Sequence, residues 1–341
     1  MIYVGSLAKG PDRDSGWIRE FQSIGWDVMS FSTEIDFRGQ IILRKIKKRF
    51  NIGRENKICQ QSLLDLVYIQ KPSWVHFRLP IEFDRKTILK LKNQNIVVTQ
   101  YFNDDPFSRK SPFGLHWKFR KALRAYDGHF VYRAHNVRSY LKAGAKFVEH
   151  CPPTFDPERH HIDLKQVRGK FIADAAFIGH CENDGRIKLL DNLYRLGFKI
   201  IIKGGNWDRA IRSRSLNVLA PISTAFGSEY NYIYSNVLAG LCFFSKINND
   251  TWTERALEIV AVGGLLVCER TKESEIYFVD REEAYFFSSI NELVEILKEL
   301  KNNPAKREQI RKAGHKRLLA GNFTIKDRAR QIDKFVQTFL R

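Results

Sequence analysis

The sequence predicts an α/β protein built from two doubly wound domains that face a central cleft. In both halves of the chain, short apolar segments typical of buried strands alternate with helical segments. This alternation favours parallel sheets covered by helices on both faces. The segment CPPTFDPERHH, residues 151–161, interrupts the alternation with three prolines, which indicates a linker. At 341 residues the chain has room for two domains of roughly 150 residues each.

The first half is predicted to hold a series of strands separated by helices. The chain start, MIYVGSLAKG, predicts a first strand followed by a glycine turn, and it lacks the basic start and long apolar region of a signal peptide. The predicted strands are residues 2–5, 27–31, 74–77, 96–102, 128–132 and 146–149. The predicted helices between them are residues 13–24, 40–50, 57–70, 84–93, 115–125 and 135–143.

The second half repeats the same alternation. The predicted strands are residues 175–178, 199–203, 216–219, 240–244, 265–268 and 284–287. The predicted helices are residues 184–196, 228–236, 252–262, 290–302, 305–319 and 325–340. We therefore expect an N-terminal domain over residues 1–155 and a C-terminal domain over residues 156–325. A last helix over residues 326–341 can return to the N-terminal domain.

The net charge of +19 implies an anionic partner, which can be a nucleic acid, an anionic lipid or a phosphorylated substrate. Residues 38–57 are dense in Arg and Lys, and Ile41, Ile42, Ile46 and Phe50 recur among them at helical spacing. Such a segment fits a basic amphipathic helix on an anionic membrane surface. It also fits a crossover helix that packs its apolar stripe on a sheet and leaves its basic face in solvent. The two interpretations are compatible.

The cellular location is predicted from two further features. No apolar run approaches the roughly 20 residues that cross a bilayer. The five cysteines are scattered and form no C-x-x-C pair, so they are interpreted as thiols of a cytosolic protein and not as a disulfide framework or zinc site. We expect a cytoplasmic protein, either free or attached peripherally to the inner face of a membrane.

The most informative motif is DTWTERALEIVAVGG, residues 250–264, which follows the apolar segment LAGLCFFS. Thr251 and Glu254 match a capping box, which predicts a helix start near Trp252. The free amides and positive dipole end of such a helix attract an anion such as a diphosphate. Gly263 and Gly264 are expected to end the helix.

Arg255 and Glu258 are three residues apart and therefore share one face of this helix. The two oxygens of the Glu258 carboxylate can accept hydrogen bonds from two neighbouring ribose hydroxyls. Arg255 can hold Glu258 in place or reach a phosphate. The alternative interpretation is a surface Arg–Glu pair on an ordinary helix of an α/β protein.

An ordered set of segments resembles a known family. The segments FIGHCENDGRIKLLDNL, LGFKIIIKGGNW, EYNYIYSNVLAGLCFF, TERALEIVAVGGLLV and SINELVEILKEL resemble the C-terminal domain of GT-B glycosyltransferases, most closely the CgeB-like (spore-maturation type) group. TERALEIVAVGGLLV carries the R-x-x-E-x-x-A-x-G-G signature of the group. The first half resembles the family more loosely, through YFNDDPF and the stretch from AYDGHF to DPERH. The resemblance implies two Rossmann-like domains and a nucleoside-diphosphate sugar donor, held mainly by the C-terminal domain.

The resemblance also implies roles for single residues. Glu258 takes the position of the ribose-binding carboxylate, and Asp250 lies eight positions earlier, where related enzymes often carry a Glu. Lys203 stands where a cation can neutralise the leaving diphosphate, and His180 stands where the family usually has an Asn. The donor-binding candidates are Gly179, His180, Lys203, Gly204, Tyr230, Asp250, Thr253, Arg255 and Glu258.

Transfer of a sugar develops negative charge on the leaving diphosphate. Fixed amides, Lys203, Arg255 and a helix N-terminus can stabilise this charge, and GT-B enzymes, by resemblance, do so without a divalent ion. We therefore expect no metal and no other cofactor. Asp104 and Asp105 with the preceding Asn suggest a metal-binding D-x-D motif, but adjacent carboxylates before a proline more often mark a loop or a helix cap.

The acceptor side is expected in the N-terminal domain. An inverting enzyme needs a base there, and Asp104 or Asp105 follows a strand end in a suitable place; a retaining enzyme needs no such base. Rival bases are His76, His116 and His129. The catalytic candidates are thus Asp104, Asp105 and Arg255. Gly5 and Ser6, in the first strand–helix turn, are candidates for contact with donor phosphates or acceptor.

Three other functions compete with this hypothesis. The charge and the aromatic residues fit a basic nucleic-acid-binding protein, although no nucleic-acid-binding motif is present. A dinucleotide-dependent enzyme is disfavoured, because GSLAKG has the wrong spacing for G-x-G-x-x-G. A non-catalytic nucleotide-sugar-binding protein on the same fold remains open. The favoured hypothesis is a glycosyltransferase that moves a sugar from a nucleoside-diphosphate sugar to a cell-surface glycan or lipid-linked acceptor.

Overall fold

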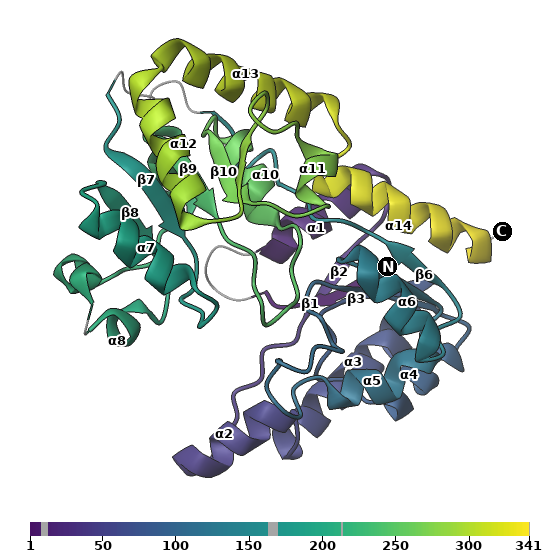
Figure 1. Cartoon of the computed structure of the whole chain (residues 1–341). Helices are drawn as coiled ribbons and strands as arrows, with labels where there is room; N and C mark the ends of the chain where they lie inside the picture. Colours follow the sequence, from purple (N-terminus) through teal and green to yellow (C-terminus); the bar gives the residue numbers. More distant parts are fainter. Residues whose placement is uncertain (8–12, 163–169, 213, 341) are drawn as a thin grey trace. The chain divides into compact units, whose positions relative to one another are not determined.

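The computed structural model describes residues 1–7, 13–162, 170–212 and 214–340, and the chain forms two compact units (Figure 1). The N-terminal unit comprises Met1–Pro152 together with Ile325–Arg341, and the C-terminal unit comprises Pro153–Thr324. Each unit contains one parallel sheet with helices on both faces. The predicted α/β class is therefore confirmed.

The sheet of the N-terminal unit has the strand order β2-β1-β3-β4-β5-β6. Its strands are β1 (Ile2–Gly5), β2 (Met29–Ser32), β3 (Trp74–Arg78), β4 (Val97–Phe102), β5 (Gly128–Val131) and β6 (Val148–His150). Ile2 lies opposite Met29 of β2 and opposite Val75 of β3, so the strand order reverses between β1 and β3. Ligands of doubly wound sheets bind at the carboxyl ends of strands at such a reversal.

Helices cover both faces of this sheet. The helices of this unit are α1 (Arg13–Ser23), α2 (Ile41–Phe50), α3 (Arg54–Gln70), α4 (Arg85–Lys92), α5 (Trp117–Ala122), η1 (Leu123–Ala125), α6 (Ala134–Lys142) and α14 (Ile325–Leu340), and of these α2 stands away from the sheet. All five residues of β3 are buried, as expected for a strand covered on both sides. On one face Trp74 packs in a cluster with α1 and α14, and on the other Val75 and Phe77 pack against α3, α4 and α5.

Helix α14 brings the last residues of the described chain into the N-terminal unit, where it lies beside α1 (Figure 1). Ile325, Ala329, Ile332 and Val336 recur at helical spacing and join the same buried cluster as Trp17 of α1. Trp26 Nε1 donates a hydrogen bond of 2.9 Å to Asp333 Oδ1. The apolar stripe of α14 thus completes one face of a sheet whose strands all come from the first 150 residues.

Helix α2 departs from one of the two predicted interpretations. None of its residues is buried, and Ile42 and Ile46 are 74% and 44% exposed. The interpretation as a crossover helix packed on the sheet by its apolar stripe is therefore wrong. The helix is attached at its carboxyl end, where Trp117 Nε1 donates to the Phe50 carbonyl at 2.9 Å and Lys47 pairs with Glu55 at 2.9 Å. Among the described residues, no helix has the length and apolarity to cross a membrane.

The sheet of the C-terminal unit has the order β11-β10-β9-β7-β8. Its strands are β7 (Ala173–Ile178), β8 (Ile200–Lys203), β9 (Val237–Cys242), β10 (Leu266–Glu269) and β11 (Tyr285–Phe287). Its helices are α7 (Arg186–Arg195), α8 (Trp207–Ile211), η2 (Ser215–Leu219), α9 (Gly227–Ser235), α10 (Glu254–Ala261), α11 (Ser274–Tyr277), α12 (Ile290–Asn302) and α13 (Pro304–Ala320). The order reverses between β7 and β9, and buried clusters pack α9 and α10 on one face and α7, α8 and α12 on the other.

The strand predicted at residues 216–219 is wrong. These residues belong to the 3-10 helix η2, which packs against α7. Leu216 is buried but Val218 is 68% exposed, and the Leu216 amide donates to Asp191 Oδ1 at 3.3 Å instead of to a neighbouring strand. A short apolar run does not by itself distinguish a strand from a helical turn.

Candidate functional site

The site of the C-terminal unit lies where the strand order reverses, at the carboxyl end of β7. Gly179 and His180 follow β7, and Gly204 follows β8. The Gly179 amide donates to the Lys203 carbonyl at 2.8 Å and the Cys181 amide to the Gly205 carbonyl at 2.9 Å. These bonds extend the pairing of β7 and β8 beyond the strands and fix both loops.

Two glycines allow the backbones at this edge to approach each other and α10. Gly204 has a φ of +133°, and a Cβ atom on it would overlap the carbonyl oxygen of Gly179. A Cβ atom on Gly179 would lie 2.7 Å from Nη2 of Arg255, closer than side-chain atoms pack. The structure therefore brings together three of the predicted donor-binding residues, Gly179, Gly204 and Arg255.

Helix α10 begins at Glu254 with Thr253 as its N-cap, so the predicted capping box of Thr251 and Glu254 with a start near Trp252 is wrong. Trp252 is buried and stacks on Tyr277 with ring centroids 4.6 Å apart, which holds residue 252 in the core outside the helix. Thr251 Oγ1 instead bonds to Glu273. The predicted helix end is confirmed, since α10 stops at Ala261 and Gly263 follows with a φ of +78°.

Arg255, in the first turn of α10, is a half-buried cation whose donors are uncommitted. Its guanidinium carbon lies 5.1 Å from the ring centroid of Phe177 of β7, a cation–π contact. In the part of the chain that the structure describes, Arg255 forms no hydrogen bond or ion pair, and so the alternative of a surface Arg–Glu pair with Glu258 is not observed. Five N–H donors are thus available for an anion at this edge.

Arg186 supports the same edge and was not predicted from the sequence. Its guanidinium carbon lies 5.4 Å from the Phe177 centroid. It donates to the His180 carbonyl at 2.8 Å and through Nε to Asp184 Oδ1 at 2.8 Å. Arg186 is buried and committed to these partners, and so it positions the loop after β7. The signal in the sequence was its place directly before the apolar run of a predicted helix.

Glu258 lies one turn after Arg255, and Tyr230 and His160 are among its neighbours. Its Oε2 accepts a hydrogen bond of 2.6 Å from the Tyr230 hydroxyl, and its Oε1 lies 3.8 Å from Nε2 of His160. Burial and the negative charge of Glu258 raise the pKa of Tyr230 well above its ordinary value, which keeps this hydroxyl a donor. His160 comes from the linker segment, and only its place in that segment could have indicated it.

The remaining predicted residues of this unit lie at the ends of strands or in the loops that follow them. Lys203 Nζ forms an ion pair of 2.9 Å with Glu229 and donates to Ser223 Oγ at 2.8 Å. The Asp250 amide donates to the Ser245 carbonyl at 2.9 Å. His180 packs so closely against Gly205 that a Cβ there would lie 2.8 Å from its Nδ1. Lys203 is therefore already paired, unlike Arg255.

In the N-terminal unit, Gly5 and Ser6 end β1 at the reversal of strand order. A Cβ on Gly5 would overlap the carboxylate of Asp14, which forms a buried ion pair with Arg78. The glycine thus makes room for this ion pair. The Ser6 hydroxyl is exposed and donates to Glu34 Oε1 at 3.4 Å.

The candidate bases of the N-terminal unit have distinct surroundings. Asp105 is 3% exposed, and its Oδ1 accepts from the Phe107 amide at 3.0 Å, the geometry of a loop cap; Asp104 is half-buried. Their catalytic role stays a prediction. His76 and His129 are fully buried, and burial lowers the pKa of each to about 3. His116 is also buried, and burial lowers its pKa. These histidines are neutral parts of the core.

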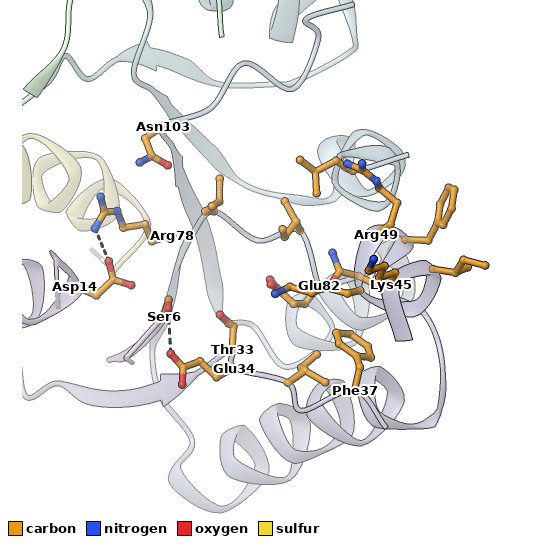
Figure 2. Close-up of a pocket in the computed structure, with 18 of the residues that line it drawn as sticks. Ser6, Asp14, Thr33, Glu34, Phe37, Lys45, Arg49, Arg78, Glu82 and Asn103 are labelled. Atoms are coloured by element: carbon orange, nitrogen blue, oxygen red, sulfur yellow. Dashed lines mark hydrogen bonds and ion pairs between the residues drawn. The ribbon is translucent and has the colours of Figure 1, made fainter. Parts of the chain in front are cut away.

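A cavity of about 1310 Å³ lies beside the carboxyl end of β1, within the N-terminal unit (Figure 2). Figure 2 shows Arg78 and Asp14 on the left of the view and Lys45 and Arg49 of α2 on the right. The cavity is lined by Ser6, Asp14, Thr33, Glu34, Ile35, Phe37, Ile42, Lys45, Ile46, Lys48, Arg49, Phe50, Asn51, Arg78, Leu79, Ile81, Glu82, Asn103 and Leu115. No pattern in the sequence indicates this cavity, because the cavity depends on α2 standing away from the sheet.

Glu82 on the cavity lining has an unusual protonation equilibrium. Burial raises its pKa from an ordinary 4.5 to about 8, although Lys118 acts in the opposite direction. The folded state therefore favours the neutral acid. The neutral form of Glu82 stabilises the folded state at pH values below the pKa that Glu82 has in the unfolded chain. This stabilisation is lost as the pH rises towards the pKa that Glu82 has in the folded protein.

We expect Glu82→Gln, which keeps the shape and stays neutral, to raise the melting temperature increasingly as the pH rises from about 5 to about 8. Differential scanning calorimetry of both proteins across this range measures the effect. A melting-temperature difference that stays constant with pH would contradict it.

Residues 186–334 match the family described as "Glycosyl transferase-like". No curated protein sequence matches the chain. Among solved structures, sucrose-phosphate synthase from Thermosynechococcus elongatus is similar over 99% of this chain and 98% of its own, with a TM-score of 0.72 and 11% identity.

Two further structures show the same fold over the whole length. A glycosyltransferase from Rickettsia africae has a TM-score of 0.64 at 11% identity and covers 100% of this chain and 98% of its own. HepE from Anabaena, in complex with UDP-glucose, has a TM-score of 0.66 at 9% identity and covers 99% of each chain. Residues 186–334 are therefore similar to glycosyl transferases, and the chain as a whole has the GT-B fold of these structures.

Proposed function

We propose that the protein transfers a sugar from a nucleoside-diphosphate sugar, without a bound metal, to a cell-surface glycan or lipid-linked acceptor. The observation that carries the proposal is Arg255. Its guanidinium is half-buried at the carboxyl end of β7, in the first turn of α10, and it feels the negative charge of Glu258 but forms no hydrogen bond or ion pair with any described residue. A diphosphate would supply an ion-pair partner, and an Arg can bind it through two parallel hydrogen bonds.

The contacts of Glu258 support a ribose subsite next to the diphosphate. The Tyr230 hydroxyl donates a hydrogen bond of 2.6 Å to Oε2 of Glu258, and a carboxylate oxygen has two lone pairs. Because a carboxylate accepts several hydrogen bonds, ribose hydroxyls would bind Glu258 beside Tyr230. Because Glu258 lies one helical turn after Arg255, one face of α10 would carry both subsites. HepE, which shares the fold, was determined with UDP-glucose.

The charge that develops on the leaving diphosphate needs fixed positive groups. Arg255, the amides of the first turn of α10 and the backbone of Gly179 and Gly204 stand at one strand edge. Preorganised donors of this kind stabilise such a charge without reorganising during the reaction. We assign the stabilisation of the leaving group to them.

The proposed acceptor side is the N-terminal unit, with residues 38–57 on an anionic membrane surface at the inner face of the membrane. Helix α2 in this segment leaves Ile41, Ile42 and Leu43 exposed beside its Lys and Arg residues. Apolar side chains and cations on one exposed helix are what a membrane surface binds.

The donor proposal predicts a selective thermal stabilisation. In a screen of UDP, GDP, CMP, ADP and dTDP without divalent metal, we expect one nucleoside diphosphate to raise the melting temperature, because a ligand that binds only the folded state stabilises it. Arg255→Gln should abolish the shift, whereas Arg281→Gln, a control on the surface of the same unit, should keep it.

A shift that requires added Mg²⁺ would contradict the metal-free mechanism. No shift with any nucleotide, together with salt-sensitive binding to generic RNA, would favour the nucleic-acid-binding alternative. A shift without turnover of the matching sugar nucleotide would favour a non-catalytic binding protein.

A further inference from the structure

We propose that the cavity beneath α2 binds the acceptor, and that this acceptor is an amphiphile with a saccharide head, a phosphate and an apolar chain. The proposal rests on the transferase function proposed above, whose donor site lies in the other unit. The proposal limits the acceptor to one chemical class and assigns its binding to named residues of the N-terminal unit. Three features of the cavity carry it.

The first feature is an apolar wall whose side chains from α2 are exposed. Ile42 and Ile46 of α2 line the cavity although they are largely exposed, and Phe37, Leu79 and Ile81 line it from the loops after β2 and β3. Exposed apolar side chains of this size gain free energy when a ligand removes them from water. At about 1310 Å³, the cavity exceeds the roughly 300–1,000 Å³ typical of small-ligand pockets. It has room for a chain as well as a head group.

The second feature is an excess of unpaired cations on the same helix. Lys45, Lys48 and Arg49 line the cavity, and none of them forms an ion pair or hydrogen bond with any described residue. Lys45 and Arg49 are four residues apart on one face, where like charges repel. The acids on the lining are Glu34, Glu82 and Asp14, of which Asp14 already pairs with Arg78. A phosphate next to α2 would relieve the repulsion.

The third feature is a set of buried polar atoms without partners. Asn51 Nδ2, Glu82 Oε2 and Asn103 Oδ1 are all buried, and all belong to lining residues. Within residues 1–7, 13–162, 170–212 and 214–340, none of the three atoms has a hydrogen-bond partner. Buried polar atoms of a native protein are normally satisfied. Saccharide hydroxyls can form the missing hydrogen bonds, because a hydroxyl can donate to the oxygens of Glu82 and Asn103 and accept from the Asn51 amide nitrogen.

The experiment uses three probes that each lack one part of the proposed acceptor. Dodecyl phosphate has a chain and a phosphate, dodecyl maltoside a chain and a saccharide, and glucose phosphate a saccharide and a phosphate. Binding to the full-length protein is measured by isothermal titration calorimetry below the critical micelle concentrations. We expect dodecyl phosphate to bind at least about tenfold more tightly than glucose phosphate, because only the former buries apolar surface.

Matched variants of α2 separate the cavity from the outer surface of the helix. The double variant Ile42→Ser/Ile46→Ser changes the cavity wall, and we expect it to weaken dodecyl phosphate binding roughly tenfold. The control Ile41→Ser/Leu43→Ser changes equally exposed positions of the same helix that do not line the cavity, and should leave binding unchanged. Because none of these residues is buried, both variants should fold.

Two further substitutions test the head group. Arg49→Gln should weaken dodecyl phosphate binding and leave dodecyl maltoside binding unchanged, with Arg44→Gln, which does not line the cavity, as its control. Asn103→Ala should weaken dodecyl maltoside binding more than dodecyl phosphate binding, because only dodecyl maltoside has saccharide hydroxyls to reach Asn103. Equal losses in the two double variants would mean adsorption on the helix surface and would overturn the assignment. Equal affinity for glucose phosphate and dodecyl phosphate would overturn the requirement for a chain.

The outcome is separable from that of the donor proposal. A nucleoside-diphosphate shift that survives in Ile42→Ser/Ile46→Ser, combined with no binding of any dodecyl probe to the unmodified protein, removes the cavity proposal alone. Binding of dodecyl phosphate with no nucleotide shift removes the proposed donor site and leaves the cavity proposal standing.

Discussion

Replacing Glu258 by Ala is expected to weaken binding of the nucleoside diphosphate by roughly 10- to 100-fold, the range for a lost hydrogen-bonded charged group. The carboxylate has one oxygen held by Tyr230 at 2.6 Å and the other near His160, so it is oriented before the ligand arrives. A preoriented group loses little conformational entropy on binding, and its removal is therefore costly. Calorimetric titration with the diphosphate found in the screen measures the loss.

Two variants make this expectation specific. Glu258→Gln keeps the shape and an acceptor for Tyr230 but removes the charge, and it should also bind the diphosphate more weakly. Glu308→Gln removes a carboxylate on the surface of α13 and should bind it like the unmodified protein. Melting curves without ligand check that all variants are folded. Unchanged donor affinity and turnover in Glu258→Ala would exclude Glu258 from the donor site.

Gly204→Ala should produce the largest structural effect of any single methyl group in the C-terminal unit. The residue has a φ of +133°, and the new Cβ would overlap the carbonyl oxygen of Gly179. A backbone atom cannot rotate away as a side chain can, so the loops after β7 and β8 must separate. We expect a lower melting temperature together with loss of nucleoside-diphosphate binding, both followed by thermal shift.

Gly185→Ala is the matched control for that substitution. Gly185 also has a positive φ, +103°, but a Cβ there would meet no atom within 4 Å. It should cost only the backbone strain, about 1–3 kcal/mol, and leave nucleotide binding intact. If the two variants lose the same stability and both still bind, the contact between the loops after β7 and β8 has no role in forming the site.

The central strands of the sheets were predictable because they are buried on both faces. The segment of β9, for example, is a continuous apolar run, and a buried parallel strand typically leaves that pattern in the sequence. The start of α10 was not predictable from its local motif, because the stacking of Trp252 on Tyr277 outweighs the capping box. The prediction of a strand at residues 216–219 was wrong for a similar reason, because these residues pack against α7 instead of pairing with a strand.

The candidate site was predictable in part. The signature residues Arg255 and Glu258 carry chemistry that can be recognised in a sequence. Their neighbours depend on the strand order, which places the loop after β7 beside α10 and brings Arg186 next to Phe177. His160 reaches Glu258 from a segment nearly 100 positions away in the chain. The cavity beneath α2 arises because an amphipathic helix does not use its apolar residues for packing, which no local pattern indicates.

The membership of α14 in the N-terminal unit affects the order in which the chain can fold during synthesis. The ribosome delivers β1 to β6 first, yet Trp17 of α1 and its buried neighbours receive Ile332 and Val336 only after the whole of Pro153–Thr324 has been made. Domains generally fold as units in the order of synthesis, but here the inserted unit is complete before the unit that surrounds it. The nascent N-terminal sheet must therefore remain unaggregated with part of one apolar face uncovered until α14 emerges.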